Sequence, residues 1–180
     1  MASPAPVRPP SLRARIARLW RHRWIDEAHV RRVLPPDALE RLTRRVAASE
    51  KRHTGEVRIC IEAGLPLSYL WRGAHARERA LMLFSKLRVW DTEHNNGVLI
   101  YLLLAEHAIE IVADRGIDAR VDDADWATTA QHMGEAFREG RFEDGLTLAL
   151  EEVSAQLVAH FPLAEGEADR NELPDAPVVL

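Results

Sequence analysis

The stretch from Val89 to Asp114 constrains the fold of this chain more than any other part of the sequence. At its centre, Gly97 to Ala105 form the longest nearly unbroken apolar run. A helix needs roughly 20 apolar residues to cross a bilayer, so this run is too short to span a membrane. A short apolar run bounded by polar turn residues is typical of a central strand buried on both faces. Asn95-Asn96-Gly97 supplies the turn before it.

The segments on either side of this strand predict its neighbours in a sheet. A polar break at Glu106-His107 precedes a second strand, from Ala108 to Ala113, that pairs back on the first as a hairpin. Upstream, Glu56 to Glu62 alternates between two faces, with Val57, Ile59 and Ile61 on one and Arg58 and Cys60 on the other. A helix from Ala76 to Leu87 joins this strand to the central one. We therefore expect a right-handed βαβ crossover with two parallel strands.

Further helices surround this sheet. Pro35-Pro36-Asp37 is a helix start, and that helix fades near His53. After the hairpin, an acidic connector leads into two helices that are separated near Gly140 and end by Phe161-Pro162. The sequence thus predicts one α/β domain in which a small mixed sheet, a βαβ crossover plus a β-hairpin, is flanked by helices.

The 180 residues divide into four parts. We expect a disordered proline-rich N-terminus (1–10), a basic amphipathic segment (11–33), the α/β domain (34–162) and an acidic, proline-containing extended tail (163–180). The N-terminus lacks the apolar core of an export signal, which predicts a cytoplasmic protein, or one peripheral on the inner membrane. A formal net charge of −4 argues against nucleic-acid binding by the whole molecule. Cys60, the single cysteine, is expected to be a small buried hydrophobe in its strand.

Two segments are candidates for contact with a membrane or a partner. From Ser11 to Trp24, apolar residues recur at helical spacing between arginines, a pattern that suits an anionic membrane surface. Nucleic acid or an acidic partner are alternatives, and in the simplest alternative the apolar stripe packs on the domain while the arginines are solvated. Residues Gly64 to Gly73 are predicted to form a loop, which is unusually apolar for a solvent-exposed segment. The candidate contact residues are Arg13, Arg15, Arg18, Trp20, Trp24, Leu67, Tyr69 and Trp71.

Several motifs in a fixed order resemble the TPM domain family. They are H-T-G-E-V-R-I at the first strand, N-N-G-V-L-I-Y-L-L-L, I-E-I-V-A-D-R-G-I, V-D-D-A and F-R-E-G-R-F-E-D-G-L. The resemblance covers roughly Pro36 to Phe161, and within the family the chain is similar to the short, leaderless bacterial subtype. It implies an α/β sandwich, divalent-cation binding in some members and a disputed acid-phosphatase activity in others. As partners it implies an anchored TPM protein or a LemA-type membrane protein. The family often has Gly-x-Gly after its third strand, where this chain has Asp114-Arg115-Gly116.

The predicted topology brings two polar segments to one edge of the sheet. These are the residues before the central strand, including Asp91 and Asn96, and those after the hairpin, including Asp114 and Asp118. Their oxygen atoms suit Ca²⁺ or Mg²⁺. Asp123 matches a recurrent acidic position of the family pattern and completes the candidate set. Alternatively, the asparagines are only turn residues and the acidic connector is only a solvated loop.

Arg115 is a candidate phosphate ligand beside such a metal, although it can equally neutralise the aspartates around it. No nucleophile or general acid accompanies it, so no catalytic residue is assigned. The sequence therefore favours a non-catalytic TPM accessory module in the cytoplasm or at the cytoplasmic membrane face, which can be tuned by a divalent cation. The alternative is a metal-dependent, acid-phosphatase-like hydrolase of phosphomonoesters.

Overall fold

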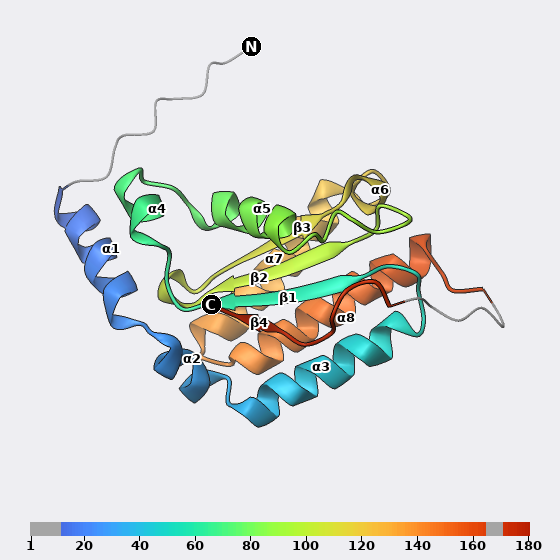
Figure 1. The fold of residues 1–180 in the computed structure, drawn as a ribbon, viewed down its shortest axis with the longest axis horizontal. Coiled ribbons are helices and arrows are strands. Elements are labelled where there is room, and N and C mark those ends of the chain that lie inside the picture. The colour runs from blue at the N-terminus through green and yellow to red at the C-terminus, as the bar shows by residue number, and fades with distance from the viewer. Residues whose placement is uncertain (1–11, 165–170) are drawn as a thin grey trace, which may run out of the picture.

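The computed structural model describes residues 12–164 and 171–180, and a four-stranded mixed sheet lies at its centre (Figure 1). The strands are β1 (Val57–Glu62), β2 (Val98–Leu103), β3 (Ala108–Ala113) and β4 (Val178–Val179), in the spatial order β3-β2-β1-β4. β1 and β2 are parallel, and β2 and β3 are antiparallel. The predicted crossover pairing and the predicted hairpin are both confirmed.

The central strand is covered on both faces, as its apolar run predicts. All six residues of β2 are buried. In β1, Val57, Ile59 and Ile61 pack into one apolar cluster, and Cys60 packs into a second cluster on the opposite face. Because successive side chains of a strand point to opposite faces, each strand contributes to both clusters.

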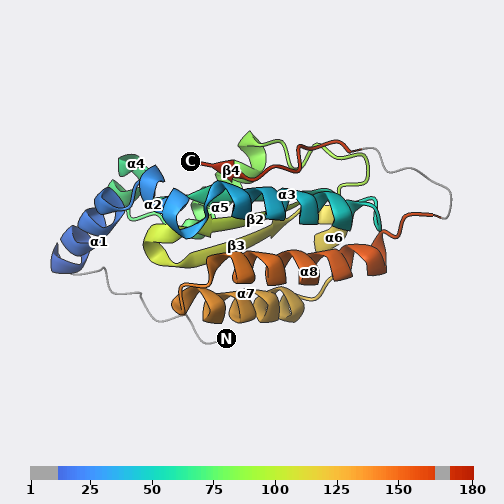
Figure 2. The same cartoon turned by 90° about the horizontal axis from the view of Figure 1, so that it is seen from below.

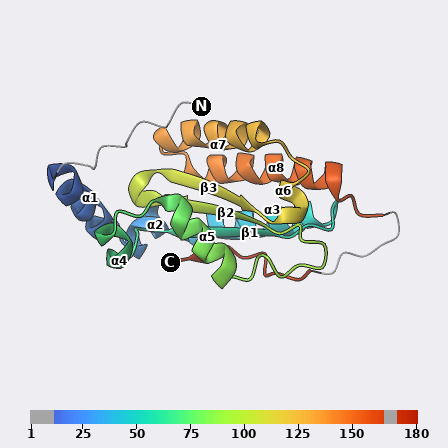
Figure 3. The same cartoon turned by 90° about the horizontal axis from the view of Figure 1, so that it is seen from above.

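Helices form a layer on each face of the sheet. One face is covered by α3 (Pro36–Glu50) and α8 (Phe142–His160), with α7 (Asp123–Arg138) beside α8 (Figure 2). The other face is covered by α5 (Ala76–Lys86) (Figure 3). Gly140, at a φ of +75°, separates α7 from α8 where the break was predicted. The helix layers on both faces of the mixed sheet confirm the predicted α/β class. No helix in the described ranges is long and apolar enough to span a bilayer.

Short helices occupy three segments in which none was predicted. α2 (Glu27–Val33) follows α1 (Leu12–Trp24), α4 (Leu67–Trp71) lies within the expected loop, and α6 (Arg115–Asp118) begins the acidic connector. The prediction of a loop throughout residues 64–73 was therefore wrong. Local capping accounts for two of these helices, since Asp26 and Asp114 each accept a hydrogen bond from a backbone N–H at the helix start.

The C-terminal segment, expected as a tail, has its last ten residues along the edge of β1. β4 pairs with β1 in parallel, and the carboxylate of Glu56 accepts hydrogen bonds from the N–H groups of Glu172 (2.9 Å) and Leu173 (3.0 Å). These contacts join residues more than a hundred positions apart, which local sequence patterns do not reveal. The expectation for residues 1–10 concerns a segment outside the described residues.

Candidate functional site

The segments before β2 and after β3 meet, as the inferred topology requires. The N–H of Asp114 donates to Gly97 O (2.8 Å), and the N–H of Gly116 donates to Asn95 O (2.9 Å). Gly116 leaves no room for a side chain, because a Cβ there would lie 2.5 Å from Asn95 O and 2.7 Å from His94 O. Two backbones in such close contact bring Asn96 and Asp114 to one edge of the sheet. We refer to this region as the Asn96–Asp114 site.

Asn96 is fully buried and held from two sides. Its N–H donates to Thr92 Oγ1 (3.1 Å), and its Nδ2 donates to the backbone oxygen of Thr54 (3.0 Å). The remaining side-chain atom, Oδ1, is buried and has no hydrogen-bond partner within the described structure. A polar oxygen of this asparagine is therefore held away from solvent.

Asp114 is also buried, with only 9% of its surface exposed, and it caps α6. Its Oδ1 accepts a hydrogen bond from the N–H of Arg115 at 2.7 Å. Its Oδ2 is buried and, like Asn96 Oδ1, unpartnered in the part of the chain that the structure describes. Asn96 Oδ1 and Asp114 Oδ2 are thus two buried oxygen atoms without donors among the described residues.

The other predicted ligands are not buried as Asn96 and Asp114 are, or have side chains outside the described structure. Asp91 is exposed and forms an ion pair with Arg88. Asp118 is exposed at the end of α6. Asp123 begins α7, and its side chain lies outside the described structure. Within the described ranges, no three His, Cys, Asp or Glu side chains gather as a set that could hold a metal ion.

Arg115 is exposed and directs its Nη2 to Asn95 Oδ1 at 3.3 Å. The guanidinium thus contacts the asparagine turn and is accessible to solvent. Cys60 is buried, and this burial raises the pKa of its thiol to about 12. The thiol is therefore protonated at neutral pH, which fits the expected packing role.

The N-terminal helix α1 lies at one end of the molecule beside α4 (Figure 1). Arg18 Nε and His22 Nε2 lie 2.6 Å and 2.9 Å from the same carboxylate oxygen of Glu106. The apolar residues Leu12, Ile16, Trp20 and Trp24 are exposed. Of the apolar stripe that was expected to pack on the domain in the simplest alternative, only Leu19 does so, against the second apolar cluster.

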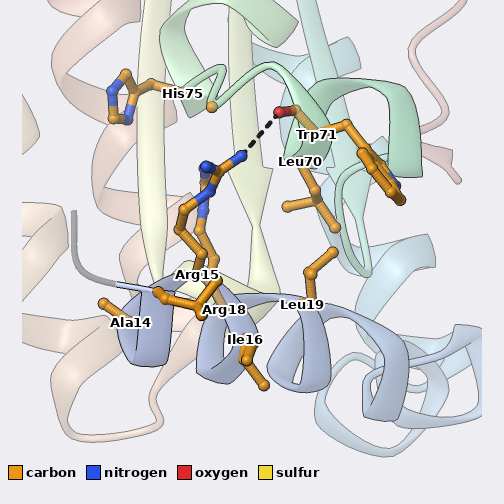
Figure 4. A pocket seen from close by; sticks show the side chains of 10 residues that line it. Ala14, Arg15, Ile16, Arg18, Leu19, Leu70, Trp71 and His75 are labelled. Carbon is orange, nitrogen blue, oxygen red and sulfur yellow. Dashed lines mark hydrogen bonds between the residues drawn. The ribbon is translucent and has the colours of Figure 1, made fainter. Parts of the chain in front are cut away.

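Helix α4 adds further exposed apolar side chains next to those of α1. Leu67 and Trp71 are exposed, whereas Tyr69 is half-buried and lies under the guanidinium groups of Arg72 and Arg79. Between α1 and α4 lies a mainly apolar groove of about 510 Å³ (Figure 4). Sequence reasoning identified most of the exposed residues here but missed Glu106 and His22, for which no local motif gives a signal.

Comparison with known proteins is consistent with this fold. The TPM domain family matches residues 26–156, which is most of the chain. The chain belongs to the TPM domain family. Its structure is similar to the NMR structure of the BA42 protein from the psychrophilic bacterium Bizionia argentinensis, with a TM-score of 0.70 and 27% sequence identity. The match covers 80% of this chain and 93% of the BA42 chain. No curated protein matches the sequence.

Proposed function

We propose that this chain is a non-catalytic TPM accessory module that binds a divalent cation at the Asn96–Asp114 site. The observation that carries the proposal is the pair of buried, unpartnered oxygens, Asn96 Oδ1 and Asp114 Oδ2, in the described structure. A buried polar atom left without a partner costs about 1–3 kcal/mol. Coordination of a cation would remove this cost.

The chemistry of these oxygens suits Ca²⁺ or Mg²⁺. Both ions prefer carboxylate and amide oxygens and complete their shells with water. The hydrogen bond from Asn96 Nδ2 to Thr54 fixes the amide, and the hydrogen bond from the Arg115 N–H fixes the carboxylate. Each group is thus positioned by one atom and keeps one unpartnered oxygen, Oδ1 of Asn96 and Oδ2 of Asp114, for the ion. Asp123, at the start of α7, is the candidate for a further ligand.

Binding is favoured over catalysis by what surrounds the site. Arg115 contacts Asn95 and would give a bound anion one positive partner. Phosphoryl transfer also needs an oriented nucleophile. Cys60 does not supply it, because the thiol is buried in β1 and protonated. No specific contact among the described residues favours the phosphatase alternative.

The experiment is thermal unfolding of the metal-stripped full chain with and without millimolar Ca²⁺ or Mg²⁺. A ligand at 100 times its dissociation constant adds about 2.7 kcal/mol to the free energy of unfolding. For a chain of this size that raises the midpoint by roughly 5–10 °C. Asp114→Asn should abolish the shift, because asparagine keeps the capping acceptor but removes the charge.

The matched control is Asp26→Asn. Asp26 also caps a short helix, α2, by accepting the N–H of His29 at 3.0 Å, and it lies outside the Asn96–Asp114 site. The control should keep the full cation-dependent shift. No shift in the wild-type protein, or an equal shift in Asp114→Asn, would refute the proposal. Hydrolysis of a phosphomonoester that is lost in Asp114→Asn would instead establish the alternative.

A further inference from the structure

The orientation of α1 on the domain is the reverse of that of an ordinary surface helix. Such a helix turns its apolar stripe to the core and its charges to solvent. Here the side that faces the domain carries polar contacts around a single apolar residue, Leu19, which packs against the second apolar cluster. Besides the contacts of Arg18 and His22 with Glu106, Arg15 Nη2 donates to Trp71 O at 3.3 Å. Figure 4 shows Arg15, Arg18 and Leu19 directed from α1 toward α4, whereas Ile16 points away from it.

The outward side of α1 is a continuous apolar stripe. Leu12, Ile16, Trp20 and Trp24 recur every four residues, and each keeps between 46% and 73% of its surface exposed. Trp71 of α4 (74% exposed) lines the groove opposite α1, and Leu67 (61%) is exposed one turn before it on the same helix. These two helices carry six of the eight large apolar side chains that are exposed in the described structure. The apolar surface is therefore concentrated at one end of the molecule.

Positive charge accompanies this stripe. Helix α1 contains five arginines and no acidic residue, although the chain as a whole has a net charge of −4. Arg13, Arg21 and Arg23 are exposed, and none forms an ion pair with a described residue. They are therefore available to an external anion.

We propose that the surface formed by α1 and α4 lies on an anionic phospholipid bilayer. Tryptophan and leucine side chains insert at the level of the headgroups, while arginines bind lipid phosphates, which is the chemistry of an interfacial amphipathic helix. A free peptide of 13 residues is only marginally helical in water. Because Glu106 already ties α1 to the folded domain, the helix needs no folding step on binding.

The charges also argue against a second copy as the occupant of this surface. A symmetric dimer would place the same patch on both subunits, so the arginines of one α1 would face those of the other. Like charges held together in this way oppose association. An anionic lipid surface neutralises the same charges. The acidic remainder of the chain is repelled from that surface, which orients the molecule with α1 toward the lipid.

The test is partitioning of the full chain onto vesicles of phosphatidylcholine alone or of phosphatidylcholine mixed with phosphatidylglycerol. We expect binding to the mixed vesicles only, with a blue shift of tryptophan fluorescence and weakening by salt. The variant Arg13→Gln, Arg21→Gln and Arg23→Gln should lower the partition coefficient roughly 100-fold, since each arginine near the surface contributes about fivefold. The charge-matched control carries glutamine at Arg44, Arg45 and Arg138, which are exposed on α3 and α7.

A second pair of variants tests the apolar stripe. Replacing Trp20 and Trp24 by alanine should abolish binding, whereas Trp90→Ala, which removes an exposed tryptophan (49%) outside this surface, should preserve it. Circular dichroism confirms that each variant is folded. The proposal would be overturned if the protein did not partition onto vesicles, or if it bound neutral vesicles equally well. An equal loss of binding in a variant and its control would also overturn it, as would association of this surface with a protein alone. The cation proposal is independent, because its readout is the shift lost in Asp114→Asn.

Discussion

Glu106 and Arg18 stand 88 residues apart in the chain, yet Arg18 Nε lies 2.6 Å from a carboxylate oxygen of Glu106. His22 Nε2 approaches the same oxygen at 2.9 Å. The N–H of Leu65 donates to His22 Nδ1 (2.9 Å), so in the neutral ring Nε2 carries the proton and donates to Glu106. One carboxylate thus holds the N-terminal helix against the domain.

Removing this carboxylate should release α1. In Glu106→Ala, Arg18 and His22 lose their shared acceptor, and local opening of the helix becomes less costly. We expect trypsin to cleave at the arginines of α1 roughly tenfold faster than in the wild-type protein, because opening that is easier by about 1.4 kcal/mol raises the open population tenfold. The control is Glu139→Ala, which removes an exposed partner of Arg141. Mass spectrometry measures the cleavage rates. Equal rates in the two variants would show that Glu106 does not hold α1 on the domain.

The same contact predicts a dependence on pH. Burial raises the pKa of Glu106, but hydrogen bonds from His22 and Arg18 outweigh it and lower the pKa from 4.5 to about 2. Because the pKa is lower in the folded state, the carboxylate contributes its full stability above about pH 4.5 and loses it as pH falls toward 2. The contribution is at most about 3 kcal/mol.

The measurement is the difference in free energy of unfolding between the wild-type protein and Glu106→Gln at a series of pH values. Glutamine has the shape of the protonated acid, so the difference should shrink through this pH window and vanish near pH 2. Glu139→Gln is the exposed control and should show no such trend. A difference that stays constant with pH would show that the charge of Glu106 is not responsible.

Two glycines should respond oppositely to alanine. Gly116→Ala forces a Cβ to within 2.5 Å of Asn95 O, a backbone atom that cannot give way cheaply, and we expect a loss of about 1–3 kcal/mol. Gly134 lies within α7, where the nearest atom to a Cβ is 3.9 Å away. Gly134→Ala should therefore stabilise the protein by about 0.5–1 kcal/mol through helix propensity. Chemical denaturation measures both, and equal effects would show that the close approach at Gly116 does not exist in solution.

Glu56 should control the docking of the C-terminal segment. Its two carboxylate oxygens accept the N–H groups of Glu172 and Leu173, and glutamine at this position keeps only one acceptor. In Glu56→Gln we expect faster hydrogen exchange at residues 171–180, with β2 unaffected. Glu151→Gln on α8 is the control. Unchanged exchange of the C-terminal segment would show that its other contacts, such as β4 pairing and the hydrogen bond from Arg58 to Ala176 O, hold it without Glu56.

Local patterns of the sequence were sufficient for the central elements of the fold. The apolar run ending at Ala105 predicted a strand buried on both faces, and the alternation of Val57, Ile59 and Ile61 predicted which side chains share a cluster. Such predictions succeed because burial on one face leaves a period of two in the residue types and burial on both faces leaves a continuous apolar run. A helix between two strands also favours parallel pairing. Turn residues were equally informative, as Gly140 marks the separation of α7 and α8.

Tertiary contacts decided the rest. That Asn96 and Asp114 carry buried, unpartnered oxygens depends on Thr54 and Arg115 occupying their other atoms, and no spacing in the sequence encodes those pairs. The outward orientation of the apolar stripe on α1 depends on Glu106, which lies in the β2–β3 connection. The sequence by itself determined which faces of its strands are apolar, because the order of apolar and polar residues along a strand shows which faces are buried. Which charges find partners was settled only by folding, because the energy of an ion pair depends on the distance between its two groups and not on their separation along the chain.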